Sequence, residues 1–296
     1  MPPDRPLRVD PGNSAGADRE SEPVPTDTTP RRYTWTELPA ELRAAIEQAA
    51  GRVTAVETPT DAYTSSFAAV LSTDRGRPVF VKLANRVDNA RSAVSQAQEK
   101  VAAMLGCGPA AHLLDVLCVG TWSGLLYTVV SGRSANYAPG SPDLPLVAAA
   151  LRRVNAIRPA AGTRLPTLVD RMARYLTPRD RSLLRGDSLL HHDLSPGNVR
   201  MHNGEVVLLD WGRATIGPQW VEGAGLYMWL REAGHSADSA RQWVIESCPS
   251  WFAGSLAARR ALLRAARAEN VRPAAEFDMW AELLDPLEAG RRGANA

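Results

Sequence analysis

A short hairpin near residue 200 constrains the fold of this 296-residue chain more than any other feature. Its signal is the pair Asn203-Gly204, which separates two apolar runs. An Asn-Gly pair in that position predicts a two-residue turn, because both residues tolerate the positive φ that the turn requires. The turn sets His202 opposite Glu205 and fixes the register of every pair further along the two strands.

The open end of this hairpin gathers polar groups. Asn198 falls opposite Leu209 in the predicted register, and Asp210 is the next residue. A second carboxylate, Asp193, precedes them in a loop that Pro196-Gly197 keeps out of helix. Two carboxylates and an amide at one site suit a hard divalent cation and a general base, as phosphoryl transfer requires. The same residue types also occur in ordinary turns, so the pattern alone leaves both interpretations open.

The bulk composition excludes several classes of protein. A hydrophobic content of 45% supports a packed core, and a net charge of +2 without a basic block disfavours a nucleic-acid partner. Three cysteines without metal spacing fit a reducing compartment. No apolar run approaches the roughly 18 residues of a membrane span, and the first residues do not resemble a signal peptide. We therefore expect a cytoplasmic protein without a membrane partner, and the oligomeric state stays open.

Lys82 is unusual because nearly all the basic residues of this chain are arginines. Of 34 basic residues only Lys82 and Lys100 are lysines, and Lys82 lies in an apolar strand. A charge there is costly unless paired, so it is either an edge-strand lysine reaching solvent or the partner of a carboxylate. Glu99, on the following helix, is the expected partner.

The first half of the chain predicts a small sheet with two helices. Residues 1–31 lack apolar periodicity and predict a disordered tail. Helix 90–105 is expected to bury an apolar stripe that includes Val94, and five strands are expected to form an antiparallel sheet. The helices are predicted over 39–50 and 90–105, and the strands over 53–57, 67–72, 79–84, 116–120 and 125–130.

Two segments of this half are candidates for nucleotide contacts. The loop between the first two strands contains no glycine, but the hydroxyls of Ser65 and Ser66 can donate to phosphate. An ordinary turn fits this loop equally well. Backbone groups from Val129 to Ser131, at the crossing to the second half, are placed to hold an adenine edge.

Beyond this crossing everything except the hairpin is predicted to be helical. The expected helices span 144–157, 165–176, 220–233, 236–246, 254–268 and 274–289.

With Lys82, Glu99, His191-His192-Asp193, Asn198 and Asp210-Trp211 in this order, the chain resembles the aminoglycoside phosphotransferase and choline kinase family. The resemblance implies an α+β, two-lobed protein-kinase-like fold. It implies an N-lobe with a five-stranded antiparallel sheet over residues 32–131 and a mostly helical C-lobe over 132–296. The short distance from Asp210 to the next helix leaves no room for the activation segment of a protein kinase.

The resemblance also implies roles for individual residues. Asp193 would be the catalytic base, and Asn198 and Asp210 would hold Mg²⁺ that bridges the phosphates of ATP. Lys82 would contact the α- and β-phosphates, with Glu99 orienting it. His191 would support the backbone near Asp210, and Glu222, where the family usually has Asp, would anchor the catalytic loop.

The expected function is transfer of the ATP γ-phosphoryl to a hydroxyl of a small metabolite or an aminoglycoside-like antibiotic. The glycine-free loop favours an alternative, a nucleotide-binding protein of the same fold with weak or no activity. Scattered acidic residues in the last third do not indicate a site for a polycation.

Overall fold

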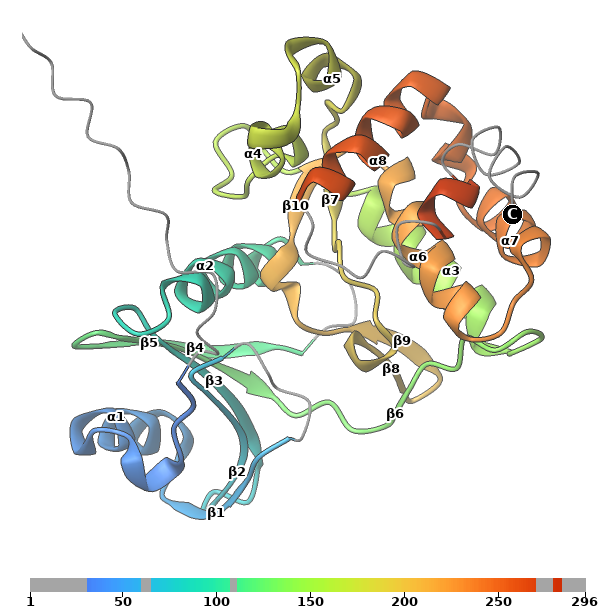
Figure 1. Ribbon diagram of the computed structural model, residues 1–296. Helices are drawn as coiled ribbons and strands as arrows, with labels where there is room; N and C mark the ends of the chain where they lie inside the picture. The colour runs from blue at the N-terminus through green and yellow to red at the C-terminus, as the bar shows by residue number, and fades with distance from the viewer. Residues whose placement is uncertain (1–30, 60–64, 107–110, 270–278, 284–296) are drawn as a thin grey trace, which may run out of the picture.

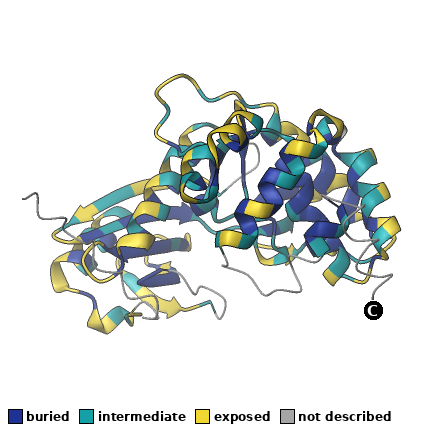
Figure 2. Ribbon diagram, turned by 45° about the horizontal axis from the view of Figure 1, so that its top comes forward, coloured by how far each residue is buried: buried dark blue, intermediate teal, exposed yellow. Residues whose placement is uncertain are grey.

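The structure is a computed structural model that describes residues 31–59, 65–106, 111–269 and 279–283. Two lobes lie side by side, one built on a sheet and the other mostly helical (Figure 1). Each lobe has its own cluster of buried apolar side chains, as the dark ribbon in Figure 2 shows. The predicted tail and the helix predicted over 274–289 lie largely outside the described residues, although 279–283 are helical.

The N-terminal lobe contains the predicted five-stranded antiparallel sheet, with strand order β1-β2-β3-β5-β4. Helices α1 and α2 lie on opposite sides of it (Figure 1). The element bounds are α1 Ala40–Ala50, β1 Val53–Glu57, β2 Phe67–Thr73, β3 Val79–Asn85, α2 Ala90–Met104, β4 Leu113–Val119 and β5 Trp122–Thr128.

Side chains alternate along each strand, so the two faces of this sheet carry different residues and have different surroundings. Residues such as Phe67 and Val81 pack with Leu42 and Ile46 of α1 into the core of the lobe. Residues of the other face, among them Lys82, line the space between the lobes. The face away from α1 is therefore free to serve a binding site.

Helix α2 contradicts the first half of the predicted apolar stripe, whereas Val101 and Leu105 of the second half pack against the core of the C-terminal lobe. Val94 is 59% exposed, whereas Ser92, Gln96 and Glu99 are buried. The inward face is polar because it meets the backbone and the charged side chain of β3: the Gln96 amide donates to the Lys82 carbonyl over 2.8 Å. A helix that serves a charged strand residue need not present an apolar face to it.

The chain crosses between lobes at Gly132, whose φ is +112°. A Cβ at this position would lie 2.1 Å from the Met201 carbonyl oxygen, so only glycine fits. Just beyond it, β6 (Arg133–Ser134) adds to the hairpin of β8 (Val199–His202) and β9 (Glu205–Leu208) as a three-stranded sheet.

The C-terminal lobe is mostly helical, with two departures from the sequence prediction. The first is the three short strands β6, β7 and β10, two or three residues long, which lack a detectable period. The second is the segment 165–176, which is broken because capping boxes at Thr167 and Thr177 each begin a new short helix. The element bounds are α3 Asp143–Asn155, α4 Leu168–Arg171, α5 Pro178–Leu183, β7 Ser188–Leu190, β10 Thr215–Gly217, α6 Trp220–Glu232, α7 Ala237–Ser247 and α8 Leu256–Glu269.

In the part of the chain that the structure describes, no helix has the length and apolar character needed to span a membrane.

Candidate active site between the two lobes

The hairpin forms with the predicted register. His202 pairs with Glu205 at the turn, and the Leu209 N–H donates to the Asn198 carbonyl over 2.8 Å at the open end. Asp210 follows with φ +55°, a left-handed conformation that Asp tolerates better than most residues. The amide and the carboxylate thus leave the two strands at the same end, as the sequence predicted.

A close approach fixes the turn after Asp210 against α2. A Cβ on Gly212 would lie 2.0 Å from the Ser95 hydroxyl oxygen, so a larger residue would require the Ser95 side chain to move. The Gly212 N–H donates to Asp210 Oδ1 over 3.4 Å, which caps the short 3₁₀ turn Trp211–Arg213. The backbone at Gly212 therefore lies directly against Ser95 of α2.

The loop that carries Asp193 is supported by the buried imidazole of His191. Its Nε2–H donates to the Leu209 carbonyl over 2.9 Å, and its Nδ1 accepts the Asp193 N–H over 3.3 Å. Burial lowers the pKa of His191, against the opposing charge of Asp193, which keeps the ring neutral as these two bonds require. The side chain links the backbone of the loop to the end of β9.

Glu222 of α6 binds the backbone of the same loop. Its Oε1 accepts the backbone N–H of His191 and, over 3.1 Å, that of His192. Burial raises the pKa of this carboxyl to about 7, although the two amide hydrogen bonds favour the charged form. The anchoring contact predicted for Glu222 is confirmed.

The predicted ion pair between Lys82 and Glu99 is present. Lys82 Nζ lies 2.9 Å from Glu99 Oε2 and 2.7 Å from Asp210 Oδ1, so one ammonium joins β3, α2 and the hairpin. The side chains of Lys82 and Glu99 are 8% and 7% exposed, whereas that of Asp210 is 41% exposed. Burial lowers the pKa of Lys82, but the two carboxylates outweigh this and raise it above its usual value. Lys82 also lowers the pKa of Asp210 against the effect of burial.

These groups line a cleft of about 770 Å³ between the lobes. Apolar side chains of the sheet form one wall, which suits the flat base of a nucleotide. Most of the predicted site residues lie in this lining: Ser65, Lys82, Glu99, Val129, Asp193, Asn198 and Asp210.

Two predicted nucleotide contacts are placed elsewhere. The Ser66 hydroxyl accepts the Asn85 N–H over 3.0 Å within the fold, and Ser131 contacts the His202 ring. Neither residue belongs to the lining of the cleft. Residues 60–64 of the glycine-free loop lie outside the described residues.

Asn198 and Asp210 offer oxygen ligands of the kind that Mg²⁺ prefers, and both face the cleft. No group of three His, Cys, Asp or Glu side chains suited to a metal occurs in the described ranges. A two-residue set is sufficient for Mg²⁺ in a phosphoryl-transfer site, because water and phosphate oxygens complete its coordination. The donor set therefore fits the predicted ion.

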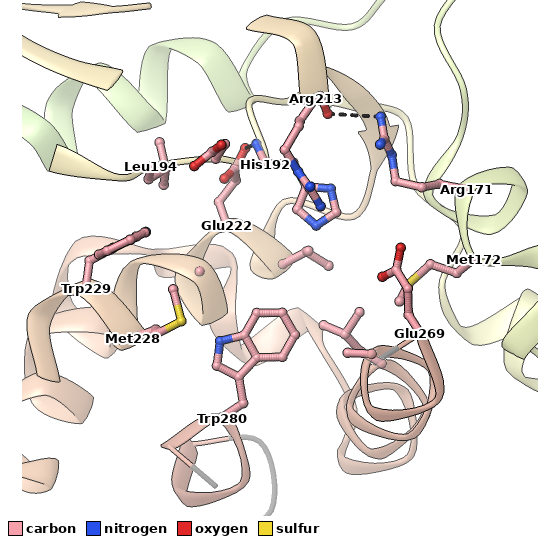
Figure 3. Close-up of a pocket in the computed structure, with 15 residues that line it drawn as sticks. Arg171, Met172, His192, Leu194, Arg213, Glu222, Met228, Trp229, Glu269 and Trp280 are labelled. Carbon is pink, nitrogen blue, oxygen red and sulfur yellow. Dashed lines mark hydrogen bonds between the residues drawn. The ribbon is translucent and has the colours of Figure 1, made fainter. Parts of the chain in front are cut away.

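A second, smaller pocket lies in the C-terminal lobe (Figure 3). It encloses about 40 Å³, room for a few water molecules. Sequence reasoning missed its charged residues Arg171, Arg213 and Glu269, which come from three separate elements. The position of Arg213, three residues after Asp210, was the one available signal. Asp193 lines both this pocket and the large cleft.

The fold is shared with solved structures of phosphotransferases. The ADP-bound aminoglycoside phosphotransferase APH(2'')-Ib is 14% identical, with a TM-score of 0.51 over 84% of this chain and 97% of its own. A protein from Haemophilus somnus 129PT, provisionally assigned as a fructosamine-3-kinase, is 13% identical, with a TM-score of 0.53 over 83% and 96%. These likenesses confirm the predicted two-lobed, protein-kinase-like α+β fold.

Aminoglycoside phosphotransferase APH(3'')-Id from Streptomyces rimosus ATCC10970, in complex with ADP and streptomycin, is 18% identical, with a TM-score of 0.48 over 84% of this chain and 99% of its own. No curated protein sequence matches the chain. A family model described as the phosphotransferase enzyme family matches residues 30–269. Because this match spans well over half of the sequence, the chain belongs to the phosphotransferase enzyme family.

Proposed function

We propose that this protein is an ATP-dependent kinase that phosphorylates a hydroxyl group of a small molecule. The observation that carries the proposal is the position of Asp193, which borders the large cleft on one side and the small pocket on the other. A base at that boundary can touch an acceptor hydroxyl in the pocket while a nucleotide fills the cleft. The ADP bound to the similar structure of APH(2'')-Ib supports the choice of nucleotide.

The reaction needs only one proton acceptor on the protein. Asp193 takes the proton of the acceptor hydroxyl as its oxygen bonds to the γ-phosphorus. The bond from that phosphorus to the β–γ bridging oxygen breaks, and ADP leaves with the bonding electrons. His191 and Glu222 hold the Asp193 loop through its backbone, so the carboxylate is positioned before the substrates arrive.

The remaining charged groups hold the nucleotide. Lys82, oriented by Glu99, donates to the α- and β-phosphates, and Ser65 and Val129 contribute further contacts from the cleft wall. Asn198 and Asp210 hold Mg²⁺, which neutralises charge on the phosphates. Lys82 bonds to Asp210 in this structure, so nucleotide binding exchanges part of that contact for phosphate.

The lobe boundary belongs to the same proposal. We place it at Gly132, with the nucleotide-binding lobe over 32–131 and the C-lobe over 132–296. The close approach of Gly132 to the Met201 carbonyl supports this position, since a Cβ there would force the crossing away from β8.

The proposal is tested by incubating the protein with Mg²⁺ and ATP and a panel of hydroxylated metabolites and aminoglycosides. Products are identified by mass spectrometry, and ADP release is measured in parallel. We expect one class of acceptor to be phosphorylated by the wild type. Asp193→Asn should lose about 10²–10⁴ in rate, the usual loss on removal of a general base. A variant with wild-type kcat would contradict the assignment of Asp193.

A further inference from the structure

Two arginines face the small pocket from different parts of the C-terminal lobe. Arg171 is the last residue of α4, and Arg213 lies in the turn that follows Asp210. Both residues line this pocket; Figure 3 shows the Arg213 side chain directed toward His192, and the Arg171 guanidinium turned toward the backbone carbonyl of Arg213. Two like charges at the edge of the same pocket, beside the proposed base, call for an explanation.

Arg171 is held in place by neutral oxygens only. Its Nε donates to the Thr215 hydroxyl over 2.9 Å, and its Nη2 donates to Gln98 Oε1 over 3.1 Å. The same Nη2 donates to the carbonyls of Arg213 and Ala214, over 3.2 and 3.4 Å. Burial, together with the nearby charge of Arg213, lowers the pKa of Arg171 to about 10. These contacts orient the guanidinium without neutralising it.

The guanidinium of Arg213 has fewer hydrogen-bond acceptors than that of Arg171. Its Nε is buried and has no hydrogen-bond partner among the described residues. Within the same residues, no ion pair joins either Arg171 or Arg213 to a carboxylate within 4.0 Å. A buried charged donor without an acceptor costs free energy, and an anion in the pocket would supply the missing acceptor.

The opposite wall limits what kind of anion fits. Glu269, at the end of α8, faces the pocket from the far side and contributes a charge that favours the ionised form of Arg171. Met228 and Trp280 supply apolar surface beside it. A carboxylate on that wall disfavours a polyanion, and the arginines disfavour a polycation, because like charges brought together are penalised. A single anionic group matches both walls.

We infer that Arg171 and Arg213 form a binding site for one anionic group, a carboxylate or a phosphate, of the acceptor molecule. This inference rests on the proposed function for the identity of the occupant as an acceptor. It makes the acceptor a small hydroxylated acid, in place of an amino sugar. The anionic group docks on the arginines, and this contact brings the hydroxyl of the same molecule to Asp193.

The first test measures anion binding without any turnover. Acetate and inorganic phosphate are titrated separately into the protein by calorimetry, which separates the two possible anion types. We expect Arg213→Gln to weaken binding about 10–100-fold, the loss of one charge-assisted hydrogen bond, and Arg213→Lys to restore part of it. Arg171→Gln should act in the same direction. Because Arg171 also links α2 to the 213–215 segment, Arg213→Gln decides the result if Arg171→Gln unfolds.

Arg174 is the matched control, because it is exposed and lies outside both pockets, and Arg174→Gln should leave anion binding unchanged. Arg200 lines the large cleft, so Arg200→Gln reports any anion that binds at the proposed nucleotide site instead. Absence of binding by the wild type would overturn the inference, as would binding that depends on Arg200 and not on Arg213.

The second test compares acceptors in the ATP assay: hydroxy acids, phosphorylated alcohols, neutral polyols and aminoglycosides. We expect turnover with a hydroxy acid or a phosphorylated alcohol, with a KM that Arg213→Gln raises about 10–100-fold. Phosphorylation of aminoglycosides or neutral polyols with unchanged kinetics in Arg213→Gln would overturn the inference while the kinase function stands. Anion binding through Arg213 without turnover of any acceptor would support the anion site and contradict the kinase.

Discussion

Two buried glutamates of this protein, Glu99 and Glu222, are stabilised by different kinds of partner. Glu99 and Glu222 are 5% and 2% exposed, so each brings a carboxylate into a low-dielectric interior. Glu99 is paired with the ammonium of Lys82. Glu222 receives two backbone N–H groups, and no ion pair reaches it among the described residues. One carboxylate is compensated by charge and the other by dipoles.

The difference matters for how each site responds to its surroundings. Lys82 keeps its charge over the physiological range, because the carboxylates raise its pKa, whereas burial raises the pKa of Glu99 against the charge of Lys82. Glu222 titrates near neutral pH, since neutral donors do not fully offset the cost of burial. The ammonium proposed to contact the nucleotide therefore stays charged near neutral pH, whereas the carboxyl that holds the Asp193 loop titrates there.

Removal of the Lys82 ammonium should have the largest effect on stability. Lys82→Met leaves Glu99 and Asp210 facing one another without their shared partner. We expect a loss of about 3–5 kcal/mol in the free energy of unfolding, measured with urea, together with weaker ATP binding. Lys100→Met is the matched control, because Lys100 is exposed, and should change little. Equal effects of the two substitutions would show that Lys82 is not compensated as described.

A double-mutant cycle tests whether Lys82 and Glu99 stabilise one another as a pair. The residues meet only through the tertiary fold, on β3 and α2. In a double-mutant cycle with Lys82→Met and Glu99→Gln, we expect a coupling energy of about 0.5–3 kcal/mol in stability. The double mutant should also lose less kcat/KM for ATP than the product of the two single losses. Strict additivity would mean that the pair does not act as a unit.

Glu222 should make stability depend on pH. Its folded pKa of about 7 lies above the unfolded value of 4.5, so the folded state holds the proton more tightly. The contribution is present below the unfolded pKa and is lost as pH rises through the folded pKa, by at most about 3 kcal/mol.

The measurement is urea unfolding of wild type and Glu222→Gln from about pH 5 to about pH 8. The wild type should lose stability relative to Glu222→Gln as pH rises, because the amide keeps the acceptor oxygen without titrating. Glu41→Gln, at an exposed position, is the control and should follow the wild type. Parallel curves for wild type and Glu222→Gln would contradict the titration of Glu222.

The smallest effects are expected on α2, where they test its polar inner face. Gln96→Ala removes the donor to the Lys82 carbonyl and the acceptor of the Ser123 hydroxyl, at a cost of about 1–3 kcal/mol. Val94→Ala, on the exposed face, should stay within about 0.5 kcal/mol of wild type. Chemical denaturation measures both losses. A larger loss for Val94→Ala than for Gln96→Ala would support the apolar inner face expected from the sequence.

The parts of the structure that the sequence predicted are those with local signals. The Asn203-Gly204 turn sets its own register, so the meeting of Asn198 and Asp210 follows from a few neighbouring residues. Lys82 was conspicuous because lysine is rare in this chain. The sheet followed from strand-length apolar runs and turn residues, and the cost of an unpaired charge in a strand pointed to Glu99 on the following helix as the partner of Lys82.

The parts that were missed depend on long-range contacts. The buried face of α2 could not be read from hydrophobicity, because Gln96 and Glu99 are buried by their hydrogen bonds to β3. Strands of two or three residues are too short to show a period. Arg171 and Arg213 are two among many arginines, and only the fold brings them to one pocket.

The central claim is that one set of residues holds the nucleotide and another transfers its phosphoryl group. Calorimetric titration of ATP with and without Mg²⁺, for wild type, Asp193→Asn and Asp210→Ala, tests this most directly. We expect Asp193→Asn to bind Mg²⁺ and ATP as the wild type does, while Asp210→Ala loses the dependence on Mg²⁺. Wild-type dependence on Mg²⁺ in Asp210→Ala, or loss of ATP binding in Asp193→Asn, would contradict this division.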